Sequence, residues 1–354
     1  MGAMKTRVPA SLEPLKDRGL VDAAAAARLT AVAERYSVAI TPAMLDLIDP
    51  DDPTDPIAAQ FVPDGRELID HPQDLSDPIG DAAHAPVPGI VHRYPDRVLL
   101  MPLRICPVYC RFCFRRETVG HTEEALLSPG ELQAALDYIR AQPAIWEVIL
   151  SGGDPLLLAP RRLGAILDAL ADIDHVQVVR IHTRVPAVDP ARVTADLVAQ
   201  LRRRQAIYVV LHTNHPRELT AAALAACARL VDSGIPMLSQ SVLLRGVNDN
   251  AATLETLLRT LVANRIKPYY LHHADNAPGT AHFRTSIAAG QDLMRELRGR
   301  VSGLCQPEYI LDIPGGHGKV PAGPVWVTPT PAGFAVTDPA GVIHTLTESR
   351  DSAG

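Results

Sequence analysis

Short apolar runs alternate with amphipathic stretches between residues 96 and 305, and this alternation strongly constrains the fold. Six runs have the composition of buried strands: Arg97–Leu103, Glu147–Ser151, Val176–His182, Ala206–His212, Pro236–Leu243 and Pro268–His273. Helical stretches follow them: Pro129–Gln142, Arg161–Ala171, Pro190–Arg203, Glu218–Ser233, Asn250–Asn264 and Ile287–Arg300. Six β-α units are fewer than the eight of a closed barrel. The sequence therefore predicts an α/β protein with a partial (β/α)6 TIM-like barrel.

Different patterns flank this repeat and divide the chain into three parts. Residues 1–95 combine short Ala- and Leu-rich amphipathic helices with a Pro- and Asp-rich stretch after Asp49, which is typical of a linker. Residues 96–305 form the predicted barrel. Residues 306–354 are rich in Pro, Gly, Val and Thr, which predicts extended segments and a β-hairpin.

The overall charge and the apolar pattern exclude some classes of protein. A net charge of −6 over 354 residues argues against a general nucleic-acid binder. No apolar run approaches the roughly 20 residues needed to cross a bilayer, so no membrane partner is expected. Five cysteines, three of them clustered, fit a reducing compartment better than a disulfide scaffold. We therefore expect a cytoplasmic protein.

The clustered cysteines, Cys106, Cys110 and Cys113, have the spacing C-x3-C-x2-C. Iron–sulfur clusters normally take four cysteine ligands, so three would leave one iron of a 4Fe-4S cluster open to a substrate. A C-x2-C pair also occurs in zinc sites and redox dithiols. However, structural zinc typically uses two such pairs, and Cys227 and Cys305 stand alone. The spacing favours a cluster with one open iron.

Polar and Gly-rich residues lie at the ends of three predicted strands. The carboxyl ends of parallel strands commonly carry binding sites. Each residue alone also fits an ordinary turn or a hydrogen bond within the barrel. Together they are candidate ligands for a nucleoside and an amino acid: Ser151, Gly152, Gly153, Asp154, His212 and Gln240.

Near the C-terminus, a loop with three glycines presents Lys319. Such a lysine can form a Schiff base with the aldehyde of pyridoxal phosphate (PLP), contact a phosphate, or remain a solvated cation. A Walker-type phosphate loop is not expected, because the loop does not lead into a helix that begins with Lys-Ser/Thr. Upstream, Arg93, Tyr94 and Arg97 are suited to a phosphate and a flat ring, or form a basic turn.

From about His92 to Val325, these blocks resemble the lysine 2,3-aminomutase family of radical S-adenosylmethionine (SAM) enzymes. The matching blocks occur in the same order along the chain, at residues 93–97, 105–116, 151–154, 239–249, 282–285, 298–303 and 314–321. The resemblance implies a radical SAM barrel that carries a 4Fe-4S cluster, SAM and PLP, with a C-terminal β-rich segment that binds PLP.

The resemblance also implies roles for individual residues. Lys319 would bind PLP covalently, and Arg93, Tyr94 and Arg97 would hold its phosphate and ring. The cluster would sit on the three cysteines, with the 151–154 segment near the methionine ammonium of SAM. The further contacts near SAM would be His212 and Gln240.

Three residues match the family's substrate contacts. Arg115 would clamp the substrate α-carboxylate, and Asp275 and Asp312 would receive its distal ammonium. A buried pair of carboxylates requires a cationic partner, because unpaired buried charge is costly. The expected substrate is therefore free L-lysine, with arginine as the alternative. Two departures stand out: His317 replaces a glycine of the family's loop, and no cysteine follows Cys305 to form the C-terminal zinc site of some members.

The implied reaction is an isomerisation of L-lysine to β-lysine by 1,2-amino migration, started by a radical derived from SAM. A reductant such as flavodoxin or ferredoxin would supply the electron, and the enzyme would be a homo-oligomer, with a dimer favoured. A related enzyme that supplies β-lysine for elongation factor P remains an alternative. A non-catalytic electron-transfer or metal-binding protein is a second alternative, but it would leave the Lys319 loop without a role.

Overall fold

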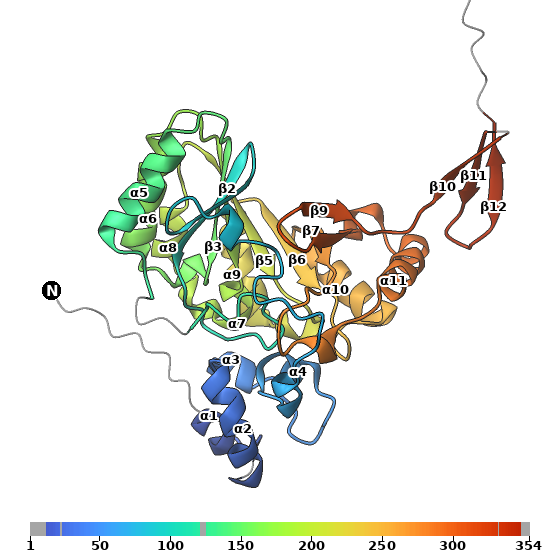
Figure 1. Cartoon of the computed structure of the whole chain (residues 1–354), viewed down its shortest axis with the longest axis horizontal. Helices are drawn as coiled ribbons and strands as arrows, with labels where there is room; N and C mark the ends of the chain where they lie inside the picture. The colour runs from blue at the N-terminus through green and yellow to red at the C-terminus, as the bar shows by residue number, and fades with distance from the viewer. Residues whose placement is uncertain (1–11, 22, 121–124, 332, 348–354) are drawn as a thin grey trace, which may run out of the picture.

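A nine-stranded sheet forms the centre of the computed structural model, which describes residues 12–21, 23–120, 125–331 and 333–347 (Figure 1). Its seven parallel strands are β2 (Arg97–Leu103), β3 (Glu147–Gly152), β4 (Val178–Thr183), β5 (Ala206–His212), β6 (Met237–Val242), β7 (Ile266–His272) and β8 (Glu308–Ile313). Antiparallel strands β1 (Ile90–Tyr94) and β9 (Gly318–Pro321) form the two edges. The described strands run in order from β1 to β9, so the sheet is an open barrel.

Each parallel strand is joined to the next by at least one helix. The main ones are α5 (Pro129–Arg140), α6 (Pro160–Ala171), α8 (Ala195–Gln200), α9 (Ala221–Asp232), α10 (Ala251–Ala263) and α11 (Ile287–Arg300). Ser128, Thr220, Asn250 and Ser286 cap α5, α9, α10 and α11, each accepting a hydrogen bond from the backbone N–H three residues further on. No helix in the described ranges is long and apolar enough to cross a membrane.

The predicted α/β partial barrel is confirmed, and the six predicted strands correspond to β2 to β7. The structure adds a seventh parallel strand, β8, where the sequence predicts only extended tail segments. Its apolar run is short and is interrupted by Asp312, which is nevertheless buried. The predicted helix over residues 190–203 is also shorter. Thr194 caps α8, and a separate 3-10 turn, η4 (Pro190–Arg192), precedes it.

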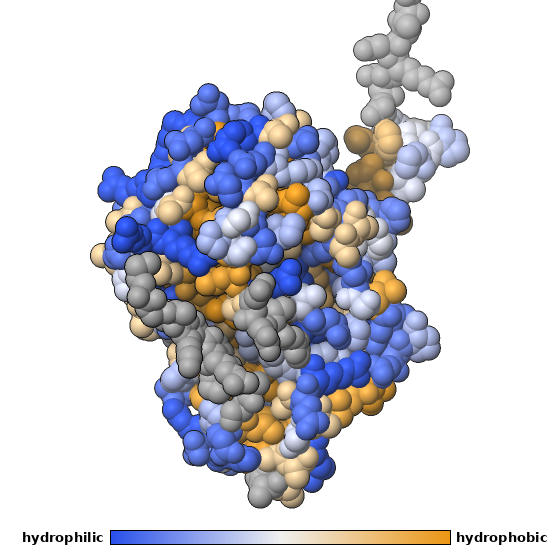
Figure 2. Space-filling view, turned by 60° about the vertical axis from the view of Figure 1, so that its left-hand side comes forward, coloured by the Kyte–Doolittle hydropathy of each residue, from blue (hydrophilic) through white to orange (hydrophobic). Residues whose placement is uncertain are grey.

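The C-terminal segment forms a second, three-stranded antiparallel sheet rather than the single predicted hairpin. Its strands are β10 (Val327–Thr330), β11 (Gly333–Thr337) and β12 (Ile343–Leu346). This sheet stands apart from the barrel, and apolar residues are exposed on it (Figure 2). The division into parts at residues 95 and 305 stays a prediction, although β8 and β9 pair with the barrel sheet.

The segment after Asp49, which the sequence predicts as a linker, packs against the barrel instead. The N-terminal elements are α1 (Glu13–Asp17), α2 (Ala23–Arg35), α3 (Pro42–Leu45), α4 (Pro56–Phe61), η1 (Gly65–Leu68) and η2 (Ala82–His84). Ile57 and Phe61 are fully buried in the same hydrophobic core as the strands β2 to β5. Asp55 caps α4 by accepting hydrogen bonds from two backbone N–H groups.

One fully buried carboxylate, Glu67 in η1, connects this segment to the loop after β2. Arg111 donates from Nε to Glu67 at 2.9 Å, and the Nη2 atoms of Arg111 and Arg116 both pair with the second Glu67 oxygen. Arg111 also donates to the carbonyl oxygen of Ser37 at 2.9 Å. Pairs of this kind join residues far apart in sequence, so a local composition pattern does not reveal them.

Glu67→Ala would leave Arg111 and Arg116 buried without a carboxylate. Removing one partner of a buried ion pair costs about 3–5 kcal/mol, so we expect a loss of this size in the free energy of unfolding. Chemical denaturation of the cofactor-free protein, followed by circular dichroism, measures it. The control is Asp292→Asn, which removes an exposed pair with Arg295 and should cost less than about 1 kcal/mol. Equal losses in both variants would contradict the role given to Glu67.

Candidate active site

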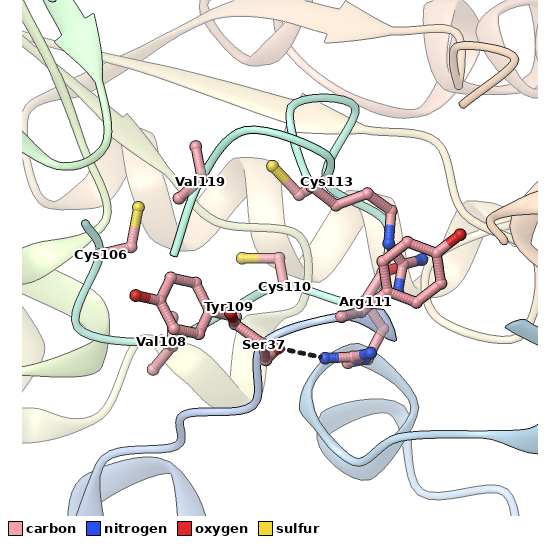
Figure 3. A pocket seen from close by; sticks show the side chains of 10 residues that line it. Ser37, Cys106, Val108, Tyr109, Cys110, Arg111, Cys113 and Val119 are labelled. Carbon is pink, nitrogen blue, oxygen red and sulfur yellow. Dashed lines mark hydrogen bonds between the residues drawn. The ribbon is translucent and has the colours of Figure 1, made fainter. Parts of the chain in front are cut away.

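The three clustered cysteines lie on the loop after β2 and line one pocket (Figure 3). Cys110 is drawn between Cys106 and Cys113, and Tyr36, Tyr109 and Arg116 complete much of the wall. The other two cysteines, Cys227 and Cys305, do not line this pocket, because they are buried in hydrophobic core clusters. The structure therefore brings together the three cysteines that the sequence predicts as ligands.

The chemistry of this pocket fits a cluster of several irons. Burial raises the pKa of the Cys113 thiol to about 11, and burial together with the charge of Asp154 raises that of Cys106 well above its usual value. Thiolates at such positions need a metal's positive charge. In the described residues, no three His, Cys, Asp or Glu side chains surround a position for a single ion. A 4Fe-4S cluster avoids this requirement, because each cysteine binds a different iron.

The glycines that end β3 let this strand approach the cysteine loop. Gly153 donates its backbone N–H to Leu103 at 2.9 Å, and a Cβ at Gly153 would lie 2.1 Å from the carbonyl oxygen of Ile105. Gly152 has a φ of +102°, which favours glycine. The structure thus gives these glycines a packing role next to Cys106, and their predicted contact with SAM stays a prediction.

Asp154 connects the ends of β3 and β4. Its buried carboxylate accepts hydrogen bonds from Leu156 N (3.1 Å), Thr183 Oγ1 (2.7 Å), Arg184 N (2.6 Å) and Val185 N (3.2 Å). Burial raises the pKa of Asp154 despite these donors. A carboxylate has about four acceptor sites, so this one is saturated by the protein. Its contact with SAM stays a prediction.

His212 and Gln240 occupy paired positions on β5 and β6. The His212 ring stacks on Phe112 of the cysteine loop, with ring centres 5.7 Å apart and an interplanar angle of 19°. Burial lowers the pKa of His212 well below its usual value, so the ring is neutral. Its Nε2 atom is buried without a hydrogen-bond partner in the described structure. The end of β5 therefore offers a free polar atom beside the cysteine loop, and Gln240 is its neighbour on β6. The contacts of both residues with SAM stay predictions.

Lys319 lies on β9, directly opposite Asp312 on β8. Its Nζ contacts both carboxylate oxygens of Asp312, and the distance to Oδ2 is 2.5 Å. Although burial opposes ionisation, the nearby His272, whose Nδ1 lies 3.8 Å from Asp312 Oδ2, and the charge of Lys319 lower the pKa of Asp312 to about 2. The Lys319 backbone N–H donates to the hydroxyl oxygen of Tyr94 at 2.8 Å. Tyr94 is thus next to the loop lysine.

The two arginines of the upstream block have different surroundings. Arg93 Nη1 lies 3.7 Å from Asp312 Oδ1, which places this cation beside the Lys319 pair. The Arg97 guanidinium lies 3.8 Å from the centre of the Tyr94 ring, and its Nη1 donates to Asp96 at 2.6 Å. Arg93 and Tyr94 therefore contact the Lys319 site directly, and Arg97 does so through the Tyr94 ring.

The predicted substrate contacts also lie near one another. The Nε and Nη2 atoms of Arg115 both lie 2.8 Å from Asp81 Oδ2, which leaves Nη1 without a partner in the described structure. Burial and the neighbouring charge of Asp312 raise the pKa of Asp275 to about 7. The charges of Lys319 and Arg115 act on Asp275 in the opposite direction. One group of charges thus contains Arg115, Asp275 and Asp312.

Sequence reasoning missed several residues of this region. Asp81 also contacts Arg93, at 3.2 Å, and so bridges two arginines. Gly80 has a φ of +68°, and a Cβ there would lie 2.5 Å from the backbone N of Gly316. His84 Nε2 is 3.2 Å from the carbonyl oxygen of Gly316. In the sequence, these residues stand out only as a Gly-Asp pair within the predicted linker. Such a pair is also common in ordinary loops, so it did not mark a functional site.

Comparison with known proteins identifies the family. Residues 100–258 match the family model described as "Radical SAM superfamily". The chain is 44% identical over 291 residues to L-lysine 2,3-aminomutase of Clostridium subterminale, covering 82% of this chain and 70% of that protein. The chain belongs to the lysine 2,3-aminomutase family. The family that the sequence blocks predict is therefore confirmed.

Other members and solved structures are similar to a lesser extent. Glutamate 2,3-aminomutase of Clostridioides difficile is 38% identical over 296 residues, which is 84% of this chain and 70% of that protein. The SuiB protein of Streptococcus suis, in a structure with S-adenosylmethionine, is 13% identical with a TM-score of 0.47, covering 62% of this chain and 51% of that one. Similarity at this level thus extends to a protein named for glutamate, so identity alone does not indicate which amino acid this chain binds.

Gly153→Ala should prevent the cysteine loop from holding its cluster, because the new Cβ would overlap the backbone before Cys106. We expect this variant to lose most of its iron and sulfide after anaerobic reconstitution, as measured by chemical analysis per chain. Gly130→Ala is the matched control, since beyond its own helix the structure describes no heavy atom within 4 Å of a Cβ there. Full iron content in Gly153→Ala would disprove the packing role of Gly153.

Proposed function

We propose that this protein is an L-lysine 2,3-aminomutase, which moves the amino group of L-lysine from C2 to C3 and forms β-lysine. The observation that carries the proposal is the pair of carboxylates, Asp275 and Asp312, in one group of charges with Lys319 and Arg115. Arg115 supplies a cation for the substrate α-carboxylate, and the two acids supply a site for a positive tail.

The contact between Lys319 and Asp312 supports a lysine-like tail. Asp312 already binds an ammonium at the end of a four-carbon side chain, that of Lys319. When Lys319 is bound covalently to PLP, this ammonium is no longer available to Asp312. Asp312 would then lose its closest cation and keep only the more distant Arg93, 3.7 Å away. Loss of a partner destabilises a buried carboxylate, and the ε-ammonium of a bound L-lysine would restore the close pairing.

The same charges discriminate against other amino acids. The side-chain carboxylate of glutamate would be a third negative group beside Asp275 and Asp312, and like charges at close range are strongly unfavourable. The side chain of arginine carries the right charge, but it is longer than that of lysine and ends in a planar guanidinium instead of a compact ammonium. We therefore place L-lysine first, with L-arginine as the comparison substrate.

Different residues of the chain would bind each cofactor. Cys106, Cys110 and Cys113 would hold a 4Fe-4S cluster, with SAM at its open iron and PLP on Lys319. When bound, these groups supply a radical that removes a hydrogen atom and a carrier for the migrating amino group. Arg93 and Tyr94 would hold PLP in place.

The cluster also requires an external electron donor of the flavodoxin or ferredoxin type, which we propose as a partner. Supply of β-lysine for elongation factor P stays a prediction. So does the homodimer.

Anaerobic reconstitution with iron, sulfide, PLP and SAM, followed by chromatography of the products, tests the proposal. We expect β-lysine from L-lysine, little product from L-arginine and none from L-glutamate. Lys319→Ala should still cleave SAM when reduced but form no β-lysine. If the reconstituted protein forms no β-amino acid from any of the three substrates, the proposed function is wrong.

Binding of L-lysine should depend on pH through Asp275, because only the ionised carboxylate attracts a cationic tail. With a pKa of about 7, the ionised fraction rises from about one eleventh at pH 6 to about ten elevenths at pH 8. We expect the affinity of the PLP-loaded protein for L-lysine to rise about tenfold over this range, as followed by PLP absorbance. Asp275→Asn should remove this dependence. Weaker binding by the unmutated protein at pH 8 than at pH 6 would contradict the role of Asp275.

A further inference from the structure

Arg184 places a buried cation beside one of the three cysteines. This residue follows β4, is 6% exposed, and its Nη1 lies 2.9 Å from Cys110 Sγ. In the part of the chain that the structure describes, this is the one side-chain hydrogen bond to a cysteine sulfur. The donor therefore distinguishes Cys110 from Cys106 and Cys113.

The guanidinium of Arg184 is held on several sides. Its Nη2 donates to Gln60 Oε1 at 2.7 Å and to Glu218 Oε2 at 2.6 Å. The rings of Phe61 and Phe112 lie 4.7 Å and 5.4 Å from its central carbon. These contacts come from α4, from the turn after β5 and from the cysteine loop itself. They leave the side chain little freedom, so its contact with Cys110 is a fixed part of the fold.

Glu218 compensates the charge of Arg184 but does not explain the contact with sulfur. This carboxylate is fully buried, and its Oε1 accepts hydrogen bonds from Asn214 N at 3.0 Å and His215 N at 2.9 Å. One carboxylate suffices to pair one guanidinium. The second nitrogen is nevertheless directed at Cys110, whose thiol would be a weak acceptor and whose thiolate would be a strong one.

We propose that Arg184 is a positioning residue that tunes the cluster through Cys110. Reduction adds one electron, from a donor of the flavodoxin or ferredoxin type, and makes the cluster and its thiolates more negative without breaking a bond. A cationic N–H donor stabilises the more negative state, and hydrogen bonds to the sulfurs are among the factors that set cluster potentials. Arg184 therefore raises the reduction potential. The inference rests only on the cluster part of the proposed function.

The test is a potentiometric titration of the reconstituted, SAM-free holoenzyme, followed by electron paramagnetic resonance. We expect Arg184→Gln to make reduction at least tenfold less favourable, which corresponds to 59 mV for a one-electron couple. Arg184→Lys keeps the charge and should fall between this variant and the unmutated protein. The control is Arg180→Gln, in the strand β4 that precedes Arg184, which removes a pair with Glu147 and should shift the equilibrium less than threefold.

A double variant separates the hydrogen bond from the net charge and from misfolding. Arg184→Gln with Glu218→Gln removes both buried charges, so neither partner is left unpaired, and it should still lower the potential because the donor to Cys110 is weakened. The proposal is overturned by an unchanged potential at full iron content, or by equal shifts in Arg184→Gln and Arg180→Gln. It is also overturned if both Arg184 variants lose their iron while Arg180→Gln keeps it. The potential is measured without SAM or lysine, so a failure of lysine isomerisation would contradict the proposed function without affecting this test.

Discussion

The pairing of buried charges around the cysteine loop is the constraint on which the rest of the site depends. Arginines are interleaved with the cysteines, and Arg111 and Arg116 are almost fully buried. Each needs a carboxylate, because an unpaired buried cation costs several kcal/mol. Glu67 supplies it for Arg111 and Arg116, and Asp81 supplies it for Arg115. Both acids come from the segment before the barrel, so the loop adopts its shape only with that segment in place.

This dependence extends to the loop that carries Lys319. The backbone of Gly80 lies so close to Gly316 that a Cβ would overlap it, and His84 contacts the same glycine. A single segment therefore packs against the loop of the predicted cluster through Glu67 and against the loop of the predicted PLP site through Gly80. A fixed spacing between two cofactors requires a rigid connection. Residues 64–84 contact both loops outside the barrel sheet and would supply such a connection if both cofactors bind as proposed.

Local patterns explain which features were predictable from the sequence. The strands β2 to β7 and the spacing of Cys106, Cys110 and Cys113 depend on residues close together along the chain. The seventh strand, β8, was missed because Asp312 interrupts its apolar run. Its pairing with Lys319, together with the nearby Arg93 and His272, offsets the cost of burying that acid. The packing of the segment after Asp49 was missed for a similar reason. Its Pro and Asp content is typical of loops, whereas its contacts are long-range.

The candidate substrate site follows the same rule of charge pairing, but with an exchangeable partner. Asp312 is stable as a buried anion in the free protein because Lys319 faces it. Asp275 has no such direct partner within the described structure, and burial and the charge of Asp312 favour its protonated form. Such a site has one ionised carboxylate, Asp312, and one that is readily ionised, Asp275. It could bind a single cationic tail without a large electrostatic cost, whether or not the tail is present. Under the proposed function, the ammonium at Asp312 would be exchanged, and the total charge of the pair would adjust through Asp275.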